Sequence, residues 1–259
     1  MDLAGKNVVY LGGFGGIGQK VCAELLERQL KALAVFDLAP NDQLMGAWQA
    51  KYPNTEIFYQ KVDITQKPEL EAAYKAAAAR LQHFDLVVNG MGLMNDHFVE
   101  LTIQINLLGL INSSLLALEH MDQTKGGRGG LVVNISSVAG LQPTPLMSIY
   151  SAAKHGVTAF TRGLADPAYY AHTGVAFITI CPGFTDTPLL ADMLDKTTFS
   201  FETPMKKIIP KVKRQPPEVC ARNMVKVIEQ GQNGGVWKLD VGEMEELDMP
   251  VMWKPVLQD

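Results

Sequence analysis

The chain has 259 residues, 47% of them hydrophobic, and a formal net charge of −4 at pH 7. This length fits one large α/β domain or two small ones, and the apolar content is sufficient for a buried core. The acidic balance argues against nucleic acid as a partner, because no basic stripe is available to neutralise phosphates. A local basic cluster, which we interpret as a solvated surface, comprises Lys206, Lys207, Lys211, Lys213 and Arg214.

Short β-branched runs alternate with helical stretches along the chain. In chain order the predicted elements are the strand Asn7–Leu11, the helix Ile17–Gln29, the strand Leu33–Leu38, the helix Asp42–Lys51, the strand Glu56–Val62, the helix Pro68–Gln82, the strand Phe84–Asn89, the helix Phe98–Met121, the strand Leu131–Ser136, the helix Ser148–Tyr170, the strand Val175–Cys181, the helix Pro216–Gln230 and the strand Gly235–Leu239. The strands are largely apolar on both faces, which is typical of a buried parallel sheet. This alternation predicts a doubly wound, Rossmann-type α/β domain, with a seven-stranded parallel sheet and helices on both faces.

No linker or change in composition divides the chain, so we expect a single domain over residues 1–259. Residues 186–215 are the one long segment without clear strand character, and they follow the end of a strand. We expect this segment to form a substrate lid. Residues 249–259 form a tail that is unusually apolar for a chain end, with Met252 and Trp253. We expect the tail to pack on a partner subunit or to cap the site.

The cysteines and histidines show no spacing for a disulfide framework or a metal site. Cys22, Cys181 and Cys220 are odd in number and far apart, which favours a reducing compartment. The N-terminus does not resemble a signal peptide, and we find no apolar run that approaches the ~20 residues of a membrane span. We therefore expect a cytoplasmic protein with no metal and no membrane contact.

A glycine-rich segment, Leu11–Gly18, follows the first strand and opens the first helix. Glycines let a backbone approach a pyrophosphate, and the helix N-terminus offers free N–H groups and positive potential. The segment fits both Gly13-x-Gly15-x-x-Gly18 and Gly12-x3-Gly16-x-Gly18, so spacing leaves the role of each glycine open. A simple flexible turn is the alternative.

Asp37 ends the second strand, 19 residues after Gly18. An acid at this place accepts hydrogen bonds from the adenosine ribose of a dinucleotide. A carboxylate there repels a 2′-phosphate, and the next cationic side chain is Lys51, so the pattern favours NAD over NADP. The alternative is an acid that caps a helix or closes a turn.

Tyr150 and Lys154 are four residues apart on a predicted helix, so their side chains lie on one face. A nearby cation lowers the pKa of a phenol, whereas burial raises it. We expect Lys154, with the positive ring of a bound nicotinamide, to lower the pKa of Tyr150 enough for it to take a proton from an alcohol near neutral pH. Ser137 follows the fifth strand, where its hydroxyl could hold a substrate oxygen, although Ser136 competes for that role.

These residues occur in the order and spacing of the short-chain dehydrogenase/reductases, which the chain resembles over nearly its whole length. The matching positions are Gly12-x3-Gly16-Ile17-Gly18, Asp37, Asp63, Asn89-Gly-x-Gly92, Asn106, Ser137, Tyr150-x3-Lys154 and Pro182-Gly183-x3-Thr187. More narrowly, the chain resembles the insect alcohol dehydrogenase branch, which includes fat-body and development-associated paralogues. The positions that carry this likeness include Asn95-Asp96-His97, Thr102-Ile103, Gly126-Gly127, Asn233-Gly234 and Trp237-Lys238-Leu239-Asp240.

The resemblance implies a catalytic role for four side chains. Tyr150 would be the general acid/base, Lys154 would lower its pKa and hold the nicotinamide ribose, and Ser137 would orient the substrate oxygen. Asn106 would keep a water in a proton path from Lys154 towards solvent.

The resemblance also implies a set of NAD contacts. Asp63 would contact the adenine, and Asn89 would steady the central strand beside the cofactor. The nicotinamide amide would be lined by Pro182, Gly183 and Thr187, with Thr185 as a further candidate. The complete set of cofactor-binding residues is Gly12, Phe14, Gly16, Ile17, Gly18, Asp37, Asp63, Asn89, Gly90, Tyr150, Lys154, Pro182, Gly183, Thr185 and Thr187. Leu11 and Met91 depart from the family pattern, where Thr and Ala are more usual.

The implied reaction interconverts an apolar secondary or primary alcohol and its ketone or aldehyde, with NAD as cofactor. Apolar residues expected near the site favour an apolar substrate; they are Leu93, Met94, Leu141, Pro143, Met147, Phe184, Leu189, Leu190, Met193 and Phe199. One alternative is a dehydrogenase for a larger lipid-like alcohol of the terpenoid, steroid or prostaglandin type. Another is a low-turnover NAD-binding developmental or fat-body protein. In relatives the helices Phe98–Met121 and Ser148–Tyr170 pair across a twofold axis, so we expect a homodimer, or a tetramer built from it.

Overall fold

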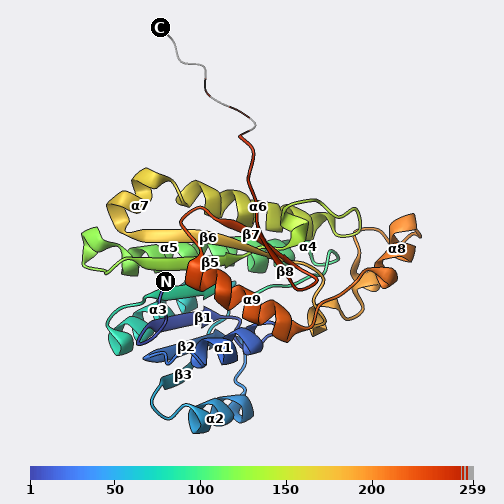
Figure 1. Ribbon diagram of the computed structural model, residues 1–259. Helices are drawn as coiled ribbons and strands as arrows, with labels where there is room; N and C mark the ends of the chain where they lie inside the picture. Colours follow the sequence, from blue (N-terminus) through green and yellow to red (C-terminus); the bar gives the residue numbers. More distant parts are fainter. Residues whose placement is uncertain (252, 254, 256–259) are drawn as a thin grey trace.

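In a computed structural model that describes residues 1–251, 253 and 255, eight strands form one sheet in the order β3-β2-β1-β4-β5-β6-β7-β8 (Figure 1). The strands are β1 (Asn7–Leu11), β2 (Ala32–Asp37), β3 (Glu56–Lys61), β4 (Leu86–Asn89), β5 (Gly130–Ile135), β6 (Val175–Pro182), β7 (Val236–Asp240) and β8 (Glu243–Glu246). Strands β1 to β7 are parallel to one another, as the alternation of strands and helices predicts. The chain order reverses beside β1, which is the arrangement of a doubly wound sheet.

The prediction of seven strands was wrong by one, because β8 adds an antiparallel edge to β7. The two strands are joined by Val241 and Gly242, which both have positive φ, as a two-residue hairpin turn of matching twist requires. Neither the sequence Glu-Met-Glu-Glu of β8 nor a turn that begins with valine is a typical strand or hairpin signal. Backbone pairing along the edge therefore forms a strand where the side chains favour none.

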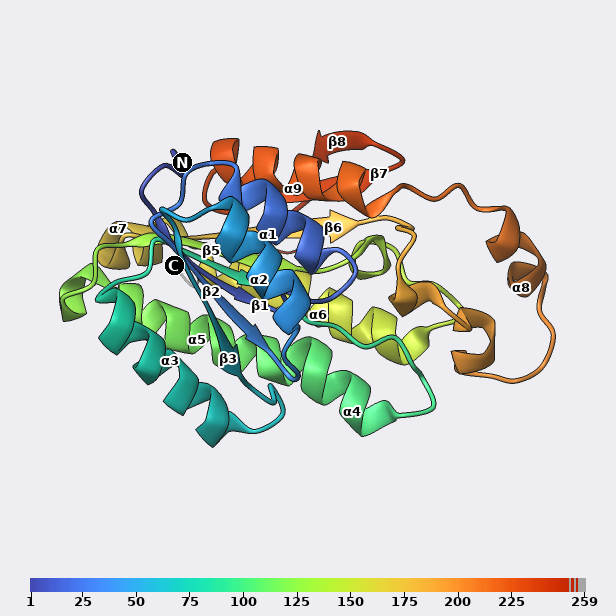
Figure 2. The same ribbon diagram turned by 90° about the horizontal axis from the view of Figure 1, so that it is seen from below.

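Helices cover both faces of the sheet (Figure 2). On one face, α1 (Gly18–Leu26) packs against α9 (Pro217–Gln230), and α2 (Asp42–Lys51) joins the same core through Met45 and Trp48. On the other face, α3 (Lys67–Leu81) packs on α5 (Leu110–Met121) around the buried Tyr74. Both faces of the sheet are thus covered, which explains why its central strands β1, β4 and β5 are buried along almost their whole length.

Two predicted helices are interrupted. The first consists of α4 (Val99–Ile103), a π-helical segment at Gln104–Gly109 and α5. The second ends at Leu164, where α6 (Ser148–Leu164) gives way to α7 (Pro167–Thr173). Asp166 caps α7 by accepting a hydrogen bond of 2.8 Å from the amide of Ala168, and Pro167 cannot continue the preceding helix because it lacks an N–H.

The segment Val99–Met121 differs from the expectation that no apolar run approaches the length of a membrane span. It is 23 residues long, and a window of 18 residues within it has a mean hydropathy of 1.6. By length and composition alone it is long and apolar enough to cross a membrane, and the prediction that no run approaches that length was wrong here. Its buried Ser113 and Ser114 donate hydrogen bonds to Asn89 and Asn134 of the sheet. These hydrogen bonds join the segment to the sheet, so it is part of the folded domain.

Residues 186–215 extend from one end of the sheet, around α8 (Pro204–Ile208) (Figures 1 and 2). Both ends of the segment are held together, since the amide of Asp186 donates to the carbonyl of Gln215 at 3.0 Å and the amide of Gln215 donates to Phe184 at 2.8 Å. The predicted tail lies partly outside the described residues, at 252, 254 and 256–259. Val251 and Trp253, two of its described residues, are exposed and do not line the cavity at the carboxyl ends of the strands.

Candidate active site

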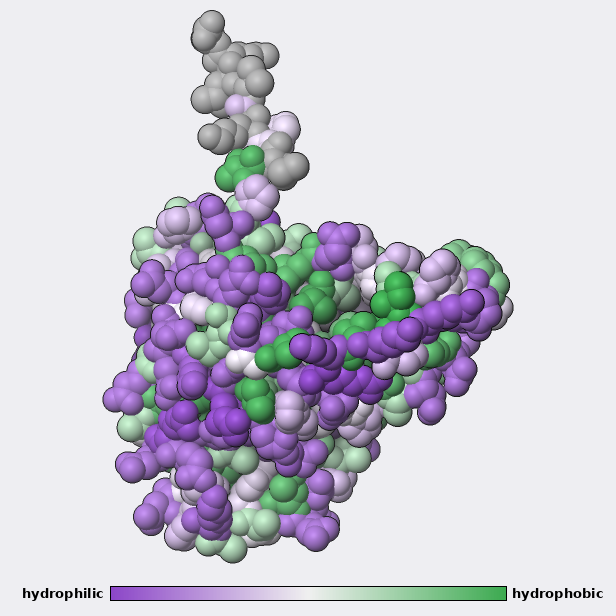
Figure 3. Space-filling view, turned by 45° about the vertical axis from the view of Figure 1, so that its right-hand side comes forward, coloured by the Kyte–Doolittle hydropathy of each residue, from purple (hydrophilic) through white to green (hydrophobic). Residues whose placement is uncertain are grey.

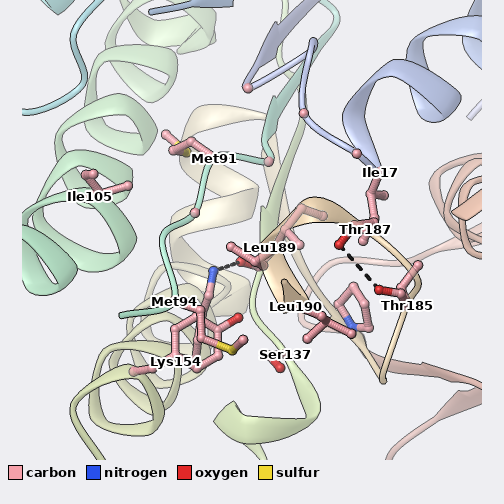
Figure 4. Close-up of a pocket in the computed structure, with 18 of the residues that line it drawn as sticks. Ile17, Met91, Met94, Ile105, Ser137, Lys154, Thr185, Thr187, Leu189 and Leu190 are labelled. Atoms are coloured by element: carbon pink, nitrogen blue, oxygen red, sulfur yellow. Dashed lines mark hydrogen bonds between the residues drawn. The ribbon is translucent and has the colours of Figure 1, made fainter. Parts of the chain in front are cut away.

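A cavity of about 920 Å³ opens at the carboxyl ends of the strands, where open α/β sheets bind ligands. Its lining includes every predicted site residue except Asn89 and Asn106; those that line it are Gly12, Phe14, Gly16, Ile17, Gly18, Asp37, Asp63, Gly90, Ser137, Tyr150, Lys154, Pro182, Gly183, Thr185 and Thr187. Figure 4 shows Lys154, Ser137 and Met94 gathered on one side of this cavity and Ile17, Thr185 and Thr187 on the other. Residues from seven separate parts of the chain thus meet in one place.

The glycine turn connects β1 to α1 and can be built only from residues without a Cβ at key places. Gly12 has φ +78°, and a Cβ on Gly18 would lie 2.2 Å from the carbonyl oxygen of Gly12. A Cβ on Gly16 would lie 2.7 Å from the side chain of Thr187. In the pattern Gly12-x3-Gly16-x-Gly18, Gly12 therefore forms the tight turn and Gly16 allows the contact with Thr187. Gly18 allows helix α1 to begin close to the turn.

Asp37 is held against this turn. Its Oδ2 accepts a hydrogen bond of 2.9 Å from the amide of Phe14, and its Oδ1 accepts one of 2.8 Å from the amide of Leu38. The ring of Phe14 packs beside Trp48 and Tyr59, with centroids 6.2 Å and 5.7 Å away. These contacts hold the carboxylate of Asp37 at the edge of the cavity. Asp37 is bonded to the glycine turn and does not act as the cap of a helix.

Tyr150 and Lys154 lie on the same face of α6, and both side chains are buried. Lys154 Nζ lies 5.8 Å from the centre of the Tyr150 ring and donates a hydrogen bond of 2.8 Å to the carbonyl of Ile135 at the end of β5. The prediction that the phenol and the ammonium share one pocket is therefore confirmed by the lining of the cavity.

The expected lowering of the phenol pKa is not found in this structure. Burial raises the pKa of Tyr150 to about 12, against the opposing effect of a hydrogen bond with Ser137. Burial likewise lowers the pKa of Lys154 to about 8. The physical reason is that desolvation disfavours the charged form of each group.

The structure distinguishes the two serines that follow β5. Ser136 Oγ donates to the carbonyl of Lys154 at 2.9 Å and lies 2.9 Å from Thr158 Oγ1, so it braces α6 against the sheet. Both serines line the cavity, but it is Ser137 that interacts with the phenol of Tyr150. Its position also suits a substrate oxygen, so Ser137 is the better candidate of the two.

Asn89 lies behind the cavity in a buried polar network. Its Nδ2 donates to Asn134 Oδ1 at 2.8 Å, and its Oδ1 accepts from Ser113 Oγ at 2.6 Å. The network joins β4, β5 and α5, in agreement with the expectation that Asn89 steadies the central strand.

Asn106 lies in the π-helical segment Gln104–Gly109, and such segments recur at functional sites. Its Nδ2 donates to the carbonyls of Leu93 and Thr102 at 2.6 Å and 2.8 Å. A Cβ on Gly92 would lie 3.2 Å from Asn106 Oδ1 and 3.9 Å from Lys154 Nζ. Gly92 thus separates the two side chains, and a larger residue there would crowd the space between them.

The half of the cavity beside the lid is apolar. The predicted apolar residues that line it are Met94, Pro143, Met147, Phe184, Leu189, Leu190 and Met193. The expectation was wrong for Leu93, Leu141 and Phe199, which are absent from the described lining, and it missed Ile105, Val138 and Met205. Met205 reaches the cavity from α8. The sequence around it does not predict this position, because its neighbours Lys206 and Lys207 indicate a solvated face.

A family model described as short chain dehydrogenase matches residues 6–198, more than half of the chain. The chain therefore belongs to the short chain dehydrogenase family, a family of oxidoreductases. Among curated relatives, Alcohol dehydrogenase 1 of Ceratitis cosyra is 43% identical over 98% of this chain and 99% of its own length. Fat body protein 2 of Drosophila melanogaster is 36% identical over 98% of this chain and 99% of its own length.

These relatives confirm the resemblance to the insect branch. The crystal structure of levodione reductase, 24% identical, covers 93% of this chain and 98% of its own with a TM-score of 0.78. That likeness agrees with the observed Rossmann-type fold.

Proposed function

We propose that this protein is an NAD-dependent dehydrogenase that interconverts an apolar alcohol and its ketone or aldehyde. The observation that carries the proposal is the meeting of Ser137, Tyr150 and Lys154 with the glycine turn and Asp37 in one cavity. The names of the relatives, alcohol dehydrogenases among them, support the same reaction class.

The residues of the cavity fit a dinucleotide. The glycine turn is a tight loop that residues with a Cβ could not form. It leads into the N-terminus of α1, where the helix would offer partial positive charge to a pyrophosphate. Asp37 would bind the adenosine ribose and Asp63 the adenine. Lys154 would hold the nicotinamide ribose, and Gly183, Thr185 and Thr187 would line the amide.

When bound, NAD would accept a hydride at its nicotinamide ring, and side chains of the protein would accept the proton. Tyr150 would take the proton of the alcohol hydroxyl, and Ser137 would donate a hydrogen bond to the developing alkoxide. The raised pKa of Tyr150 means that this step needs positive charge brought close to the phenol. Lys154 supplies part of that charge. Asn106 would hold a water between Lys154 and solvent.

The apolar half of the cavity favours an apolar substrate. Methionines at 94, 147, 193 and 205 line it, and flexible thioethers adapt to irregular apolar shapes. This lining favours the larger lipid-like alcohol as the second candidate substrate. The segment 186–215 would act as the lid, because Leu189, Leu190, Met193 and Met205 reach the cavity from it.

We further propose a cytoplasmic homodimer formed by the helices Val99–Met121 and Ser148–Leu164. Leu101, Leu108 and Leu115 are exposed at intervals of seven residues along the first of these helices. We propose that a twofold partner covers this exposed stripe of leucines.

The test is the reduction of NAD by the purified protein with a panel of primary and secondary alcohols of increasing chain length. Turnover that depends on the alcohol and on Tyr150 supports the proposal, and the preferred length separates small from lipid-like substrates. If the protein binds NAD but is inactive with every alcohol of the panel, a low-turnover binding protein is supported instead. The similarity to Fat body protein 2 is the reason to test this alternative.

A further inference from the structure

Asp96 is a buried carboxylate outside the cavity lining, in the loop between β4 and α4. Its Oδ2 accepts a hydrogen bond of 2.9 Å from the amide of Ile149, and its Oδ1 accepts one of 3.0 Å from the amide of Tyr150. The residue at the N-cap of α6 is Met147, whose side chain carries no oxygen to cap the helix. The cap of the helix that carries Tyr150 and Lys154 is therefore supplied from 54 residues away.

The same carboxylate also binds residues 186–215. Thr198 Oγ1 donates to Asp96 Oδ2 at 2.6 Å and accepts from the amide of Ser148 at 2.9 Å. In the backbone, the amide of Asp96 donates to the carbonyl of Lys196 at 2.9 Å, and the amide of Thr198 donates to Leu146 at 2.9 Å. One side chain thus joins three segments: the loop after β4, the first turn of α6 and the middle of residues 186–215.

This junction has a consequence for the chemistry because Tyr150 is one of the two residues whose amides Asp96 holds. A change in the position of the first turn of α6 moves the phenol relative to Ser137. Thr198 is five residues after Met193, which lines the apolar half of the cavity, so a change in the position of Thr198 would be passed along the chain towards Met193. Both movements are opposed by bonds to the same carboxylate.

We infer that Asp96 is a positioning residue that couples the seating of the lid to the placement of Tyr150. The inference rests on the proposed function, in which Tyr150 is the acid/base and residues 186–215 form the lid. A carboxylate is required because Asp96 accepts three hydrogen bonds and donates none from its side chain. An amide in its place has one oxygen to accept them and a nitrogen that repels a donor.

Four variants separate coupling from a general loss of structure. Asp96→Asn disturbs the whole junction, and Thr198→Val removes only the hydroxyl that links the lid. Thr198→Ser retains that hydroxyl. The matched control is Asp122→Asn, because Asp122 is also buried and caps a turn, accepting from the amide and the hydroxyl of Thr124 at 2.8 Å. Asp122 lies outside the cavity.

With an alcohol that the parent turns over, Thr198→Val should raise KM about fivefold and leave kcat within about twofold. Asp96→Asn should raise KM and also lower kcat about tenfold, as expected for the loss of hydrogen bonds to a charged group. Thr198→Ser and Asp122→Asn should both stay within about twofold of the parent. In the double variant Asp96→Asn/Thr198→Val, the KM effects should be less than multiplicative because the two residues share one junction.

Hydrogen exchange of the protein without cofactor gives a second readout that does not depend on activity. Asp96→Asn should speed exchange about tenfold in peptides that cover residues 146–152 and 196–200, whereas Asp122→Asn should change neither. A parent without dehydrogenase activity would refute the proposed function and leave this measurement intact. The coupling is refuted by unchanged exchange in either peptide, by parent-like kinetics of Asp96→Asn, or by multiplicative effects in the double variant.

Discussion

The amide of Phe14 donates a hydrogen bond of 2.9 Å to Asp37 Oδ2. This bond fixes the glycine turn after β1 to the acid at the end of β2, so the two parts of the dinucleotide motif form one rigid unit. An acid predicted to bind a ribose therefore also shapes the turn that would bind a pyrophosphate.

This double role predicts two effects of Asp37→Asn. The loss of negative charge should reduce the repulsion of a 2′-phosphate, and the weaker bond to Phe14 should loosen the turn. We expect the ratio of kcat/KM for NAD over NADP to fall by about tenfold or more. The control is Asp42→Asn, which removes the same charge at an exposed position on α2. An unchanged cofactor ratio in Asp37→Asn would refute the ribose role.

Removal of the phenol oxygen in Tyr150→Phe should lower kcat by roughly 10²–10⁴-fold, the usual range for a general acid/base. Affinity for NAD, measured by quenching of protein fluorescence, should remain within about twofold of the parent. Tyr74→Phe is a suitable control, because the hydroxyl of Tyr74 is also buried and lies 2.8 Å from a serine, Ser113, outside the cavity. Turnover by Tyr150→Phe at the parent rate would exclude Tyr150 as the base.

The buried Lys154 should make the stability of the cofactor-free protein depend on alkaline pH. Its pKa is lowered in the fold from 10.5 to about 8, so between these values the unfolded chain binds more protons than the folded one. The free energy of unfolding should then rise with pH. Tyr150, with a pKa raised from 10.0 to about 12, has the opposite effect, but only above pH 10.

Lys154→Met isolates this contribution. Between pH 8 and pH 10 the parent should gain about 2–3 kcal/mol in free energy of unfolding relative to the variant. Denaturant unfolding of both proteins at several pH values measures the difference. A constant difference across that interval would show that Lys154 is not desolvated as the structure indicates.

The exposed stripe of leucines predicts the effect of a charge on assembly. Leu108→Glu places a carboxylate at the centre of the proposed twofold contact, where it would be buried without a partner. Sedimentation should then show a monomer at micromolar concentration, whereas the parent should sediment as a dimer or larger species. Val241→Glu, at an exposed turn between β7 and β8, should leave assembly unchanged. A parent that is itself monomeric would contradict the proposed interface.

Figure 3 shows apolar side chains exposed on the side of the molecule that carries α8, bordered by polar ones. Phe199 and Phe201 stack there with ring centroids 5.3 Å apart, and both are exposed. The sequence predicted Phe199 near the site because it lies in the lid segment, but the stacked pair turns outward.

Much of the architecture could be predicted from local patterns. Apolar strands with alternating helices indicate a parallel sheet, because burial on both faces leaves no polar side of a strand. The glycine turn, Asp37 and the pair Tyr150 and Lys154 could likewise be found, since each depends on residues close in sequence. The interval of four residues on α6 is enough to place the phenol and the ammonium on one face.

The tertiary structure decided what depends on contacts between distant segments. It added β8, whose pairing is a property of the backbone at an exposed edge. It also distinguished Ser136, whose hydroxyl binds α6, from Ser137, which interacts with Tyr150. It revealed Asp96 as the cap of a helix that begins 52 residues later along the chain. It also showed that burial raises the pKa of Tyr150. The sequence places a cation four residues away, but only the packed fold determines how far both groups are removed from water.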